Sequence, residues 1–295
     1  MHSCLAIQLI TALLLFAGSV QAVELKQASL LGSYDWRNNA DWFGGFSAVH
    51  ISESGQSMIA VINRATLVRA RIERDRDTIS DIQILDQWPI LSSKGRVLKG
   101  RAGDSEGIAV APDGSYYVSF EGVHRVAHYA APGANARVLP RPREFLNMEL
   151  NGSFEALAID EEGRLYTLTE KARTIRGDIP VYRWDGTNWS APFVLPPRGK
   201  FLPVAADFGP DGRFYVLERG VAFIGFRSRL RRRVISDDVP KAEETLFETD
   251  TGTHDNLEGL SVWRDQEGQL RATMVSDDNF LSLQRTEVVE YLLPD

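Results

Sequence analysis

The sequence predicts an all-β protein, a β-propeller of five blades with about four antiparallel strands in each blade. Three observations support this fold. A two-strand phrase recurs at intervals of roughly 50 residues, a tight-turn signal follows the first strand of each copy, and no stretch between copies shows a long helical period. Six blades are the alternative if one copy has diverged. The sequence does not distinguish a ring from an open solenoid, but ring closure is favoured because it removes exposed strand edges.

Each copy begins with a residue that varies between copies, and this residue is followed by Ala or Gly. The five pairs, in chain order, are Ser47-Ala48, Glu106-Gly107, Glu155-Ala156, Val204-Ala205 and Glu258-Gly259. Small residues on one face of a strand allow neighbouring sheets to approach closely. Pro112-Asp113-Gly114 and Pro210-Asp211-Gly212 then indicate the tight turns of β-hairpins.

Further strands are expected between the copies. Candidates are Arg125 to Tyr129, Val181 to Trp184, Phe223 to Ile235 and Val288 to Leu293. The last copy leaves room for only about three strands before Asp295. We therefore expect Glu24 to Ser33 to supply the fourth and to close the ring, within a single domain over residues 23–295.

Residues 1–22 are predicted to be a signal peptide. Leu9 to Val20 is apolar, and Val20-Gln21-Ala22 is a small-residue cleavage site. The alternative to a cleaved signal peptide is an uncleaved membrane anchor. No later segment is predicted to span a membrane as a helix. The only cysteine, Cys4, lies in this leader, so the mature chain is expected to form no disulfide. We therefore expect a periplasmic or secreted protein, and the net charge of −7 argues against nucleic acid as a partner.

Hairpin geometry predicts where chemical groups gather. The start of a first strand and the end of its antiparallel partner lie at the same edge of the sheet, opposite the tight turn. Acidic residues occupy these positions in several copies, and we expect them at one mouth of the ring. They are Glu106, Glu155 and Glu258 at strand starts, and Glu121, Glu170, Asp277 and Asp278 at strand ends.

Carboxylates crowded at a narrow mouth raise one another's pKa unless a positive charge compensates them. A calcium ion is one remedy, and its predicted ligands are Glu106, Glu155, Glu258, Asp277 and Asp278. Arginine is the other remedy, and Arg64, Arg101 and Arg219 are predicted to bind an anionic substrate.

Catalytic roles are predicted for Glu106, Glu155, Glu258 and His254, the last as a general base. In the alternative, purely structural interpretation, the residue that opens a blade caps a loop or bonds the backbone of the next blade. No phosphate-binding loop or dinucleotide fingerprint is present, so no organic cofactor is expected.

One basic run, Phe226 to Ile235, is expected to form a strand with Arg227, Arg229, Arg231 and Arg233 on one face. The structural interpretation is a solvated outer face paired with acids. The functional alternative is a contact with an anion.

Several phrases together resemble a known family. They include Phe43-Gly44-Gly45-Phe46-Ser47, Asp104 to Ala109 and Asn256 to Ser261. The chain resembles the exported phytase-like family labelled "esterase-like activity of phytase". This resemblance implies a secreted or periplasmic propeller with phosphoester or ester hydrolase activity. The Glu-Gly phrases are also similar to those of calcium-dependent lactonases of the senescence-marker type.

The leading hypothesis is therefore a periplasmic esterase or phosphoesterase that acts on a small anionic substrate at an acidic, metal-assisted mouth. Two alternatives stay open. One is a non-catalytic propeller that binds a protein or a cell-envelope ligand, and the other is a calcium-dependent lactonase. Fold alone does not choose among them.

Overall fold

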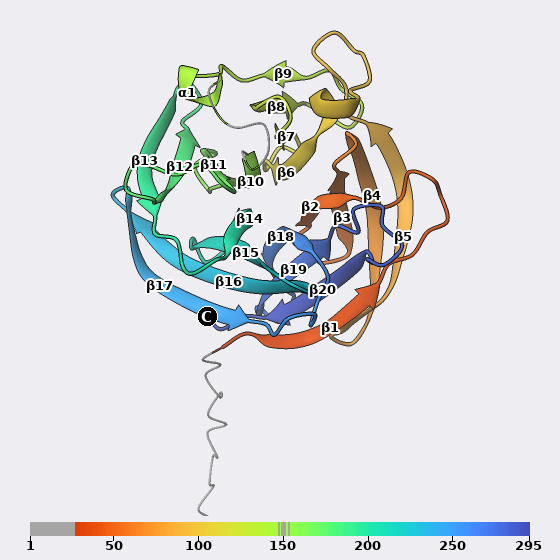
Figure 1. Ribbon diagram of the computed structural model, residues 1–295. Helices are drawn as coiled ribbons and strands as arrows, with labels where there is room; N and C mark the ends of the chain where they lie inside the picture. Colours follow the sequence, from red (N-terminus) through yellow and green to blue (C-terminus); the bar gives the residue numbers. More distant parts are fainter. Residues whose placement is uncertain (1–26, 147, 149–151, 153) are drawn as a thin grey trace, which may run out of the picture.

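Five four-stranded antiparallel sheets surround a central axis in the computed structural model, which describes residues 27–146, 148, 152 and 154–295 (Figure 1). The predicted five-bladed propeller is confirmed. Blades 1 and 2 follow the chain from the axis outward. Their strands are β2 (Phe46–Ile51), β3 (Ser57–Ile62), β4 (Thr66–Asp75) and β5 (Thr78–Pro89), then β6 (Ser105–Val110), β7 (Tyr116–Phe120), β8 (Arg125–Tyr129) and β9 (Arg137–Val138).

Blades 3 and 4 repeat the same order. Their strands are β10 (Phe154–Ile159), β11 (Leu165–Thr169), β12 (Ile179–Trp184) and β13 (Trp189–Leu195), then β14 (Leu202–Phe208), β15 (Phe214–Ala222), β16 (Gly225–Ser236) and β17 (Val239–Glu248). Helical structure in the described residues is limited to the 3-10 turn η1 (Gly100–Gly103) and the short α1 (Arg143–Leu146).

Blade 5 closes the ring by joining the two ends of the described chain. It contains β18 (Leu257–Arg264), β19 (Leu270–Ser276), β20 (Glu287–Leu292) and, as its outer strand, β1 (Ser29–Asp35). The N-terminal region therefore supplies the fourth strand, as predicted, although β1 begins and ends later than the expected Glu24 to Ser33. Residues 24–26 and the predicted signal peptide lie outside the described residues.

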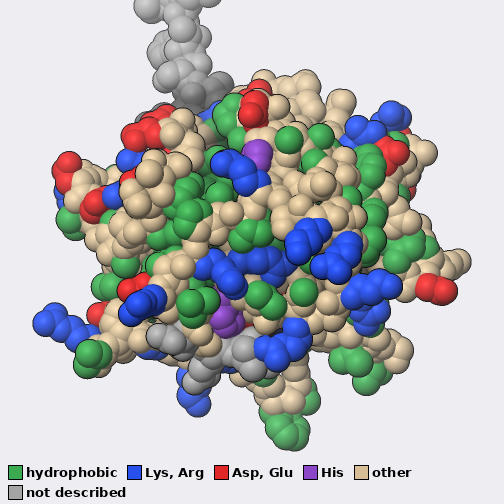
Figure 2. Space-filling view, turned by 90° about the horizontal axis from the view of Figure 1, so that it is seen from above, with side chains coloured by type: hydrophobic (Ala, Val, Ile, Leu, Met, Phe, Trp, Pro, Cys, Tyr) green, Lys and Arg blue, Asp and Glu red, His purple; other side chains and the backbone are tan. Residues whose placement is uncertain are grey.

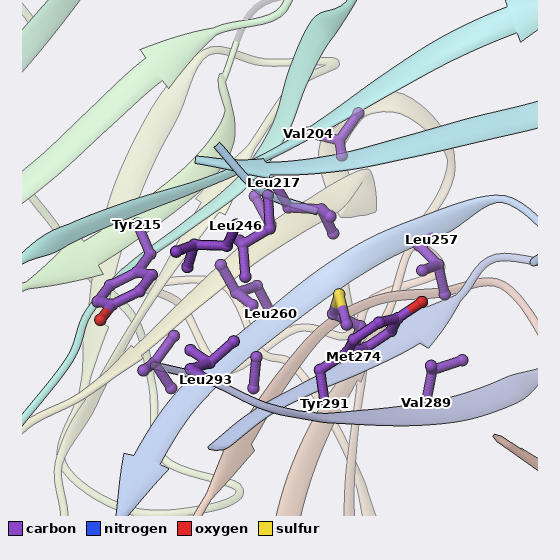
Figure 3. Packing of buried hydrophobic residues seen from close by; sticks show 14 of the residues in the cluster. Val204, Tyr215, Leu217, Leu246, Leu257, Leu260, Met274, Val289, Tyr291 and Leu293 are labelled. Atoms are coloured by element: carbon purple, nitrogen blue, oxygen red, sulfur yellow. The ribbon is translucent and has the colours of Figure 1, made fainter. Parts of the chain in front are cut away.

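The hydrophobic core lies between blades rather than at one centre. Figure 3 shows the cluster where blades 4 and 5 meet, with Leu217 and Tyr215 of β15 facing Leu260 and Met274 of blade 5. Equivalent clusters fill the other blade interfaces. Because the sheets pack face to face, each inner strand is fixed by its neighbours on both sides.

Two glycines are needed where inner strands approach most closely. A Cβ at Gly107 would lie 2.8 Å from Leu157 Cβ on the next inner strand. A Cβ at Gly259 would lie 3.0 Å from the backbone of Ala48. The small residue that follows each blade-opening residue is therefore required by blade packing.

Charge is unevenly distributed over the molecule. Figure 2 looks onto the side of the ring that carries β9 and α1, where Lys and Arg side chains gather. Exposed Arg137, Arg141 and Arg143 belong to this segment. Since the whole chain carries a net charge of −7, the negative charge is concentrated elsewhere. None of the helices in the described part of the chain has the length and hydropathy needed to cross a bilayer.

Candidate functional site: an acidic mouth of the propeller

A β-bulge interrupts every inner strand at the same place. In each blade, two residues of the inner strand oppose one residue of the second strand near its end. The extra residues are Ser47, Glu106, Glu155, Val204 and Glu258. A bulge redirects a side chain out of the regular pleat, so the five residues form a ring around the axis with one member per blade.

A second ring is formed at the mouth end of the second strands; its member directly follows the strand in four blades, whereas in blade 4 it lies within the longer β15. In blade 1, Ala48 pairs with Val61 of the second strand, and the ring residue lies two positions after Val61. The same spacing holds in the other four blades. The ring residues are Asn63, Glu121, Glu170, Arg219 and Asp277. The two rings carry six carboxylates and one guanidinium, and they lie at the mouth opposite the tight turns.

Arg219 connects three blades at this mouth. Its Nη2 donates to Glu170 Oε1 of blade 3 at 2.6 Å. Its Nη1 donates to Glu258 Oε1 and, at 2.8 Å, to Asn256 Oδ1, both of blade 5. The Arg219 side chain is 16% exposed, and its two Nη atoms are occupied by site residues. The geometry therefore makes Arg219 a neutralising group for the surrounding carboxylates.

Three carboxylates of blade 2 come together beside this arginine network. Oxygens of Asp104, Glu106 and Glu121 lie within 4.8 Å of one another. The Glu121 backbone N–H donates to Asp104 O at 2.9 Å, which fixes the two segments relative to each other. Burial, together with Glu155 and Glu258, raises the pKa of Glu106 well above its usual value. Such a group of oxygens is suited to a hard cation.

Glu155 lies between the blade 2 carboxylates and the Arg219 network. Burial is the main reason that its pKa is raised well above normal, and Glu121, Glu258 and Glu170 raise the pKa further. No hydrogen bond or ion pair holds its carboxylate within the described residues. Glu155 is therefore a partly buried carboxyl group that is available for proton transfer or for a ligand.

Asp277 and Asp278 have different environments. Burial, followed by the charge of Glu258, raises the pKa of Asp277 to about 8. Asn63 Nδ2 donates to its Oδ2 at 3.2 Å. Asp278 accepts hydrogen bonds from the backbone N–H groups of Gly45 and Phe280 and from Thr286 Oγ1. Asp277 thus belongs to the acidic mouth, whereas the hydrogen bonds of Asp278 hold together the loop that follows β19.

Three predicted site residues do not make contacts with the carboxylate rings. His254 is buried against Tyr291, with Nε2 2.8 Å from its hydroxyl, and burial lowers the pKa of His254. Arg64 is exposed and stacks over the ring of Phe280. Arg101 is exposed and lies near enough to Asp104 for its charge to lower the pKa of that carboxyl, although burial dominates and raises it. The roles predicted for these residues stay predictions.

Other polar residues have structural contacts. Ser47 Oγ donates to Ser105 O at 2.7 Å, and Ser105 Oγ donates to Ile62 O at 2.8 Å, so both hydroxyls join blades 1 and 2. The basic run on β16 pairs with acids as expected, since Arg229 and Arg231 both bind Glu218. The expectation of a solvated face was wrong here, because Arg231 and Arg233 are each only 1% exposed.

Sequence reasoning missed two site residues, Asp104 and Asn256. Each lies two positions before the bulged glutamate of its blade, and each contacts that mouth. Asn256 Nδ2 donates to Glu258 Oε1 at 2.8 Å. The shared spacing Asp-x-Glu-Gly and Asn-x-Glu-Gly is the signal that identifies them.

Comparisons with known proteins agree with this fold and place the chain in a family. Residues 41–280 match the family described as "Phytase-like: Esterase-like activity of phytase". The chain belongs to this phytase-like family of β-propellers. Comparison with curated proteins gives no match.

Solved structures that align over most of this chain share little sequence with it. The PQQ-bound aldose sugar dehydrogenase from Streptomyces coelicolor aligns over 92% of this chain and 100% of its own, with 11% identity and a TM-score of 0.51. A putative gluconolactonase aligns over 91% and 93%, with 12% identity and a TM-score of 0.43. At 11% identity and a TM-score of 0.51, the likeness to the sugar dehydrogenase concerns the fold alone.

Proposed function

We propose that this protein is an ester or phosphoester hydrolase that uses a divalent cation, calcium in the first instance, at its acidic mouth. The observation that carries the proposal is the gathering of Asp104, Glu106 and Glu121 oxygens within 4.8 Å, next to Glu155 and Glu258. Membership of the phytase-like family supports the same reaction class.

The residues at the mouth suit calcium by their chemistry. They offer carboxylate and amide oxygens, which hard cations prefer, and the described site contains no sulfur or imidazole ligand. Burial raises the pKa of Glu106 and Glu155, and the charges of neighbouring carboxylates raise both further. Asp104, Glu106 and Glu121 would hold the ion, which would supply a Lewis acid and a more acidic bound water.

The remaining groups suggest how a substrate is handled. Glu155 has a raised pKa and no partner, so it is suited to donate a proton to the leaving alcohol oxygen while water supplies the hydroxyl group. Arg219 holds Glu170 and Glu258 in place. Lys171, which lies 3.2 Å from Glu170 and is 50% exposed, and Arg101 are the cations positioned to attract an anionic substrate.

The test combines metal binding with turnover. Calcium titration should raise the melting temperature of metal-free protein, and Glu106→Gln should weaken this effect. On a panel of chromogenic phosphate esters, carboxyl esters and lactones, Glu155→Gln should lower kcat by about 100-fold or more. Glu267→Gln, an exposed residue at a distant turn, is the matched control and should change neither result.

The outcomes separate the alternatives. Turnover of lactones alone would replace ester hydrolysis with lactonase activity. Calcium binding without turnover of any substrate would favour a binding propeller for a protein or envelope ligand. Absence of both calcium binding and turnover would overturn the proposal. Export to the periplasm belongs to the same proposal and is tested by cell fractionation.

A further inference from the structure

The opposite end of the propeller axis contains a separate cavity of about 920 Å³. All five blades line it where their inner strands end and their tight turns begin. The acidic mouth lies at the start of the same strands. The cavity therefore shares no lining residue with the carboxylate rings.

Its wall contains an apolar ring with one residue per blade. The members lie three positions after Ala48 and its equivalents, and they are Ile51, Val110, Ile159, Phe208 and Val262. Val110, Ile159 and Phe208 are only half-buried. Apolar side chains that converge on a concavity of this volume are typical of small-molecule sites.

The rim of the cavity carries uncompensated negative charge. Arg164 is paired with Asp160 and Glu162, and Arg264 is paired with Asp295, so the arginines of the lining are occupied.

Acids of the rim remain without such partners. Glu53 and Glu161 are exposed and form no ion pair within the described residues. His50 also lines the cavity, and burial lowers its pKa to about 4, so it adds no positive charge at neutral pH. The cavity thus combines an apolar wall with an acidic rim.

We propose that this cavity binds a small organic cation with an apolar body, such as an aromatic or alkyl amine. The apolar body would contact the ring that includes Ile159 and Phe208, and the ammonium group would face Glu53 and Glu161 at the rim. This complementarity of shape and charge is independent of the proposed hydrolase site, because the two sites lie at opposite ends of the inner strands.

The test uses three probes with one aromatic body and different charge: 1-naphthylmethylammonium, 1-naphthylmethanol and 1-naphthoate. Calorimetric titration at pH 7 with saturating calcium should give the tightest binding for the ammonium probe and the weakest for the carboxylate. The double variant Glu53→Gln/Glu161→Gln should weaken ammonium binding by about fivefold. It should leave binding of the neutral alcohol unchanged.

Two further variants locate the binding site. Ile159→Trp should narrow the apolar ring and weaken all three probes by tenfold or more, whereas Glu267→Gln should have no effect. Glu53→Gln and Glu161→Gln change exposed residues and avoid the core. The binding comparison with this double variant therefore remains informative if Ile159→Trp does not fold. Equal affinity for the ammonium and carboxylate probes would overturn the proposal. So would loss of ammonium binding in Glu106→Gln, since the probe would then occupy the acidic mouth.

Discussion

Replacing Asp277 with asparagine should stabilise the metal-free protein more strongly as the pH rises. Asp277 is 3% exposed, and burial raises its pKa from 3.8 to about 8. A carboxyl whose pKa is raised by folding contributes stability below its unfolded pKa and loses that contribution as the pH rises through its folded pKa. Asparagine does not titrate. The stability difference between Asp277→Asn and the natural chain should therefore grow in favour of the variant across this pH range.

The expected slope follows from linkage and is about 1.4 kcal/mol per pH unit between the two pKa values. From pH 5 to pH 7 the difference should change by roughly 3 kcal/mol. The new amide also faces Asn63 and the backbone N–H of Asn279, which adds an offset of about 1 kcal/mol that does not vary with pH. Only the slope of the stability difference with pH therefore tests the raised pKa of Asp277.

Urea unfolding in EDTA at pH 5, 6 and 7 measures this slope for both proteins. Asp86→Asn provides the control, because Asp86 is an exposed partner of Arg69 on the outer strand β5. Its difference from the natural chain should stay flat. A flat difference for Asp277→Asn as well would refute the conclusion that Asp277 is desolvated and surrounded by like charge.

Two other changes test the mouth and its scaffold. Arg219→Gln should cost about 3–5 kcal/mol in urea unfolding at pH 8, because buried carboxylates lose their counter-charge. The loss should shrink at pH 5, because burial raises the pKa of Glu258 and this carboxyl is more fully protonated there. Arg69→Gln, in an exposed pair, should cost less than about 1 kcal/mol, and equal losses would contradict the argument. Gly259→Ala should cost about 1–3 kcal/mol by thermal unfolding, because its Cβ would lie 2.7 Å from Val275. Gly32→Ala, whose nearest neighbouring atom would be at 3.4 Å, should unfold like the natural chain.

The sequence contains most of the information needed for the fold. The repeat alignment on Ala48 and its equivalents is confirmed in all five blades. Hairpin turns are predictable because glycine and proline restrict the local backbone. Ring closure by an N-terminal strand is predictable from the missing fourth strand of the last copy. Its bounds are not, because β1 pairs with β20 through an irregular register that no local pattern specifies.

The site was less predictable because side-chain direction depends on register. Glu218 and Arg219 are adjacent within β15, where this strand pairs with the start of β14. Arg219 reaches the carboxylates, whereas Glu218 faces into its own blade and binds Arg229 and Arg231. The bulges were not anticipated either, since one extra residue in a strand leaves no compositional signal. Burial of Arg231 depends on packing between distant segments, which periodicity does not reveal.

Blades 1 and 4 make the mouth asymmetric, and blade 1 carries the neutral Ser47 and Asn63 at the two ring positions. At the two ring positions, blades 2 and 3 both carry glutamate, whereas blade 4 carries Val204 and Arg219. A symmetric acidic ring would place buried like charges around the whole axis, which is unfavourable without several counter-ions. Relative to blades 2 and 3, blade 4 lacks both carboxylates and adds a guanidinium that binds Glu170 and Glu258 on either side. The remaining charge is then concentrated at blade 2, where Asp104, Glu106 and Glu121 converge. The proposed cation site would thus be confined to one side of the axis, and the other side of the mouth would be available to a substrate.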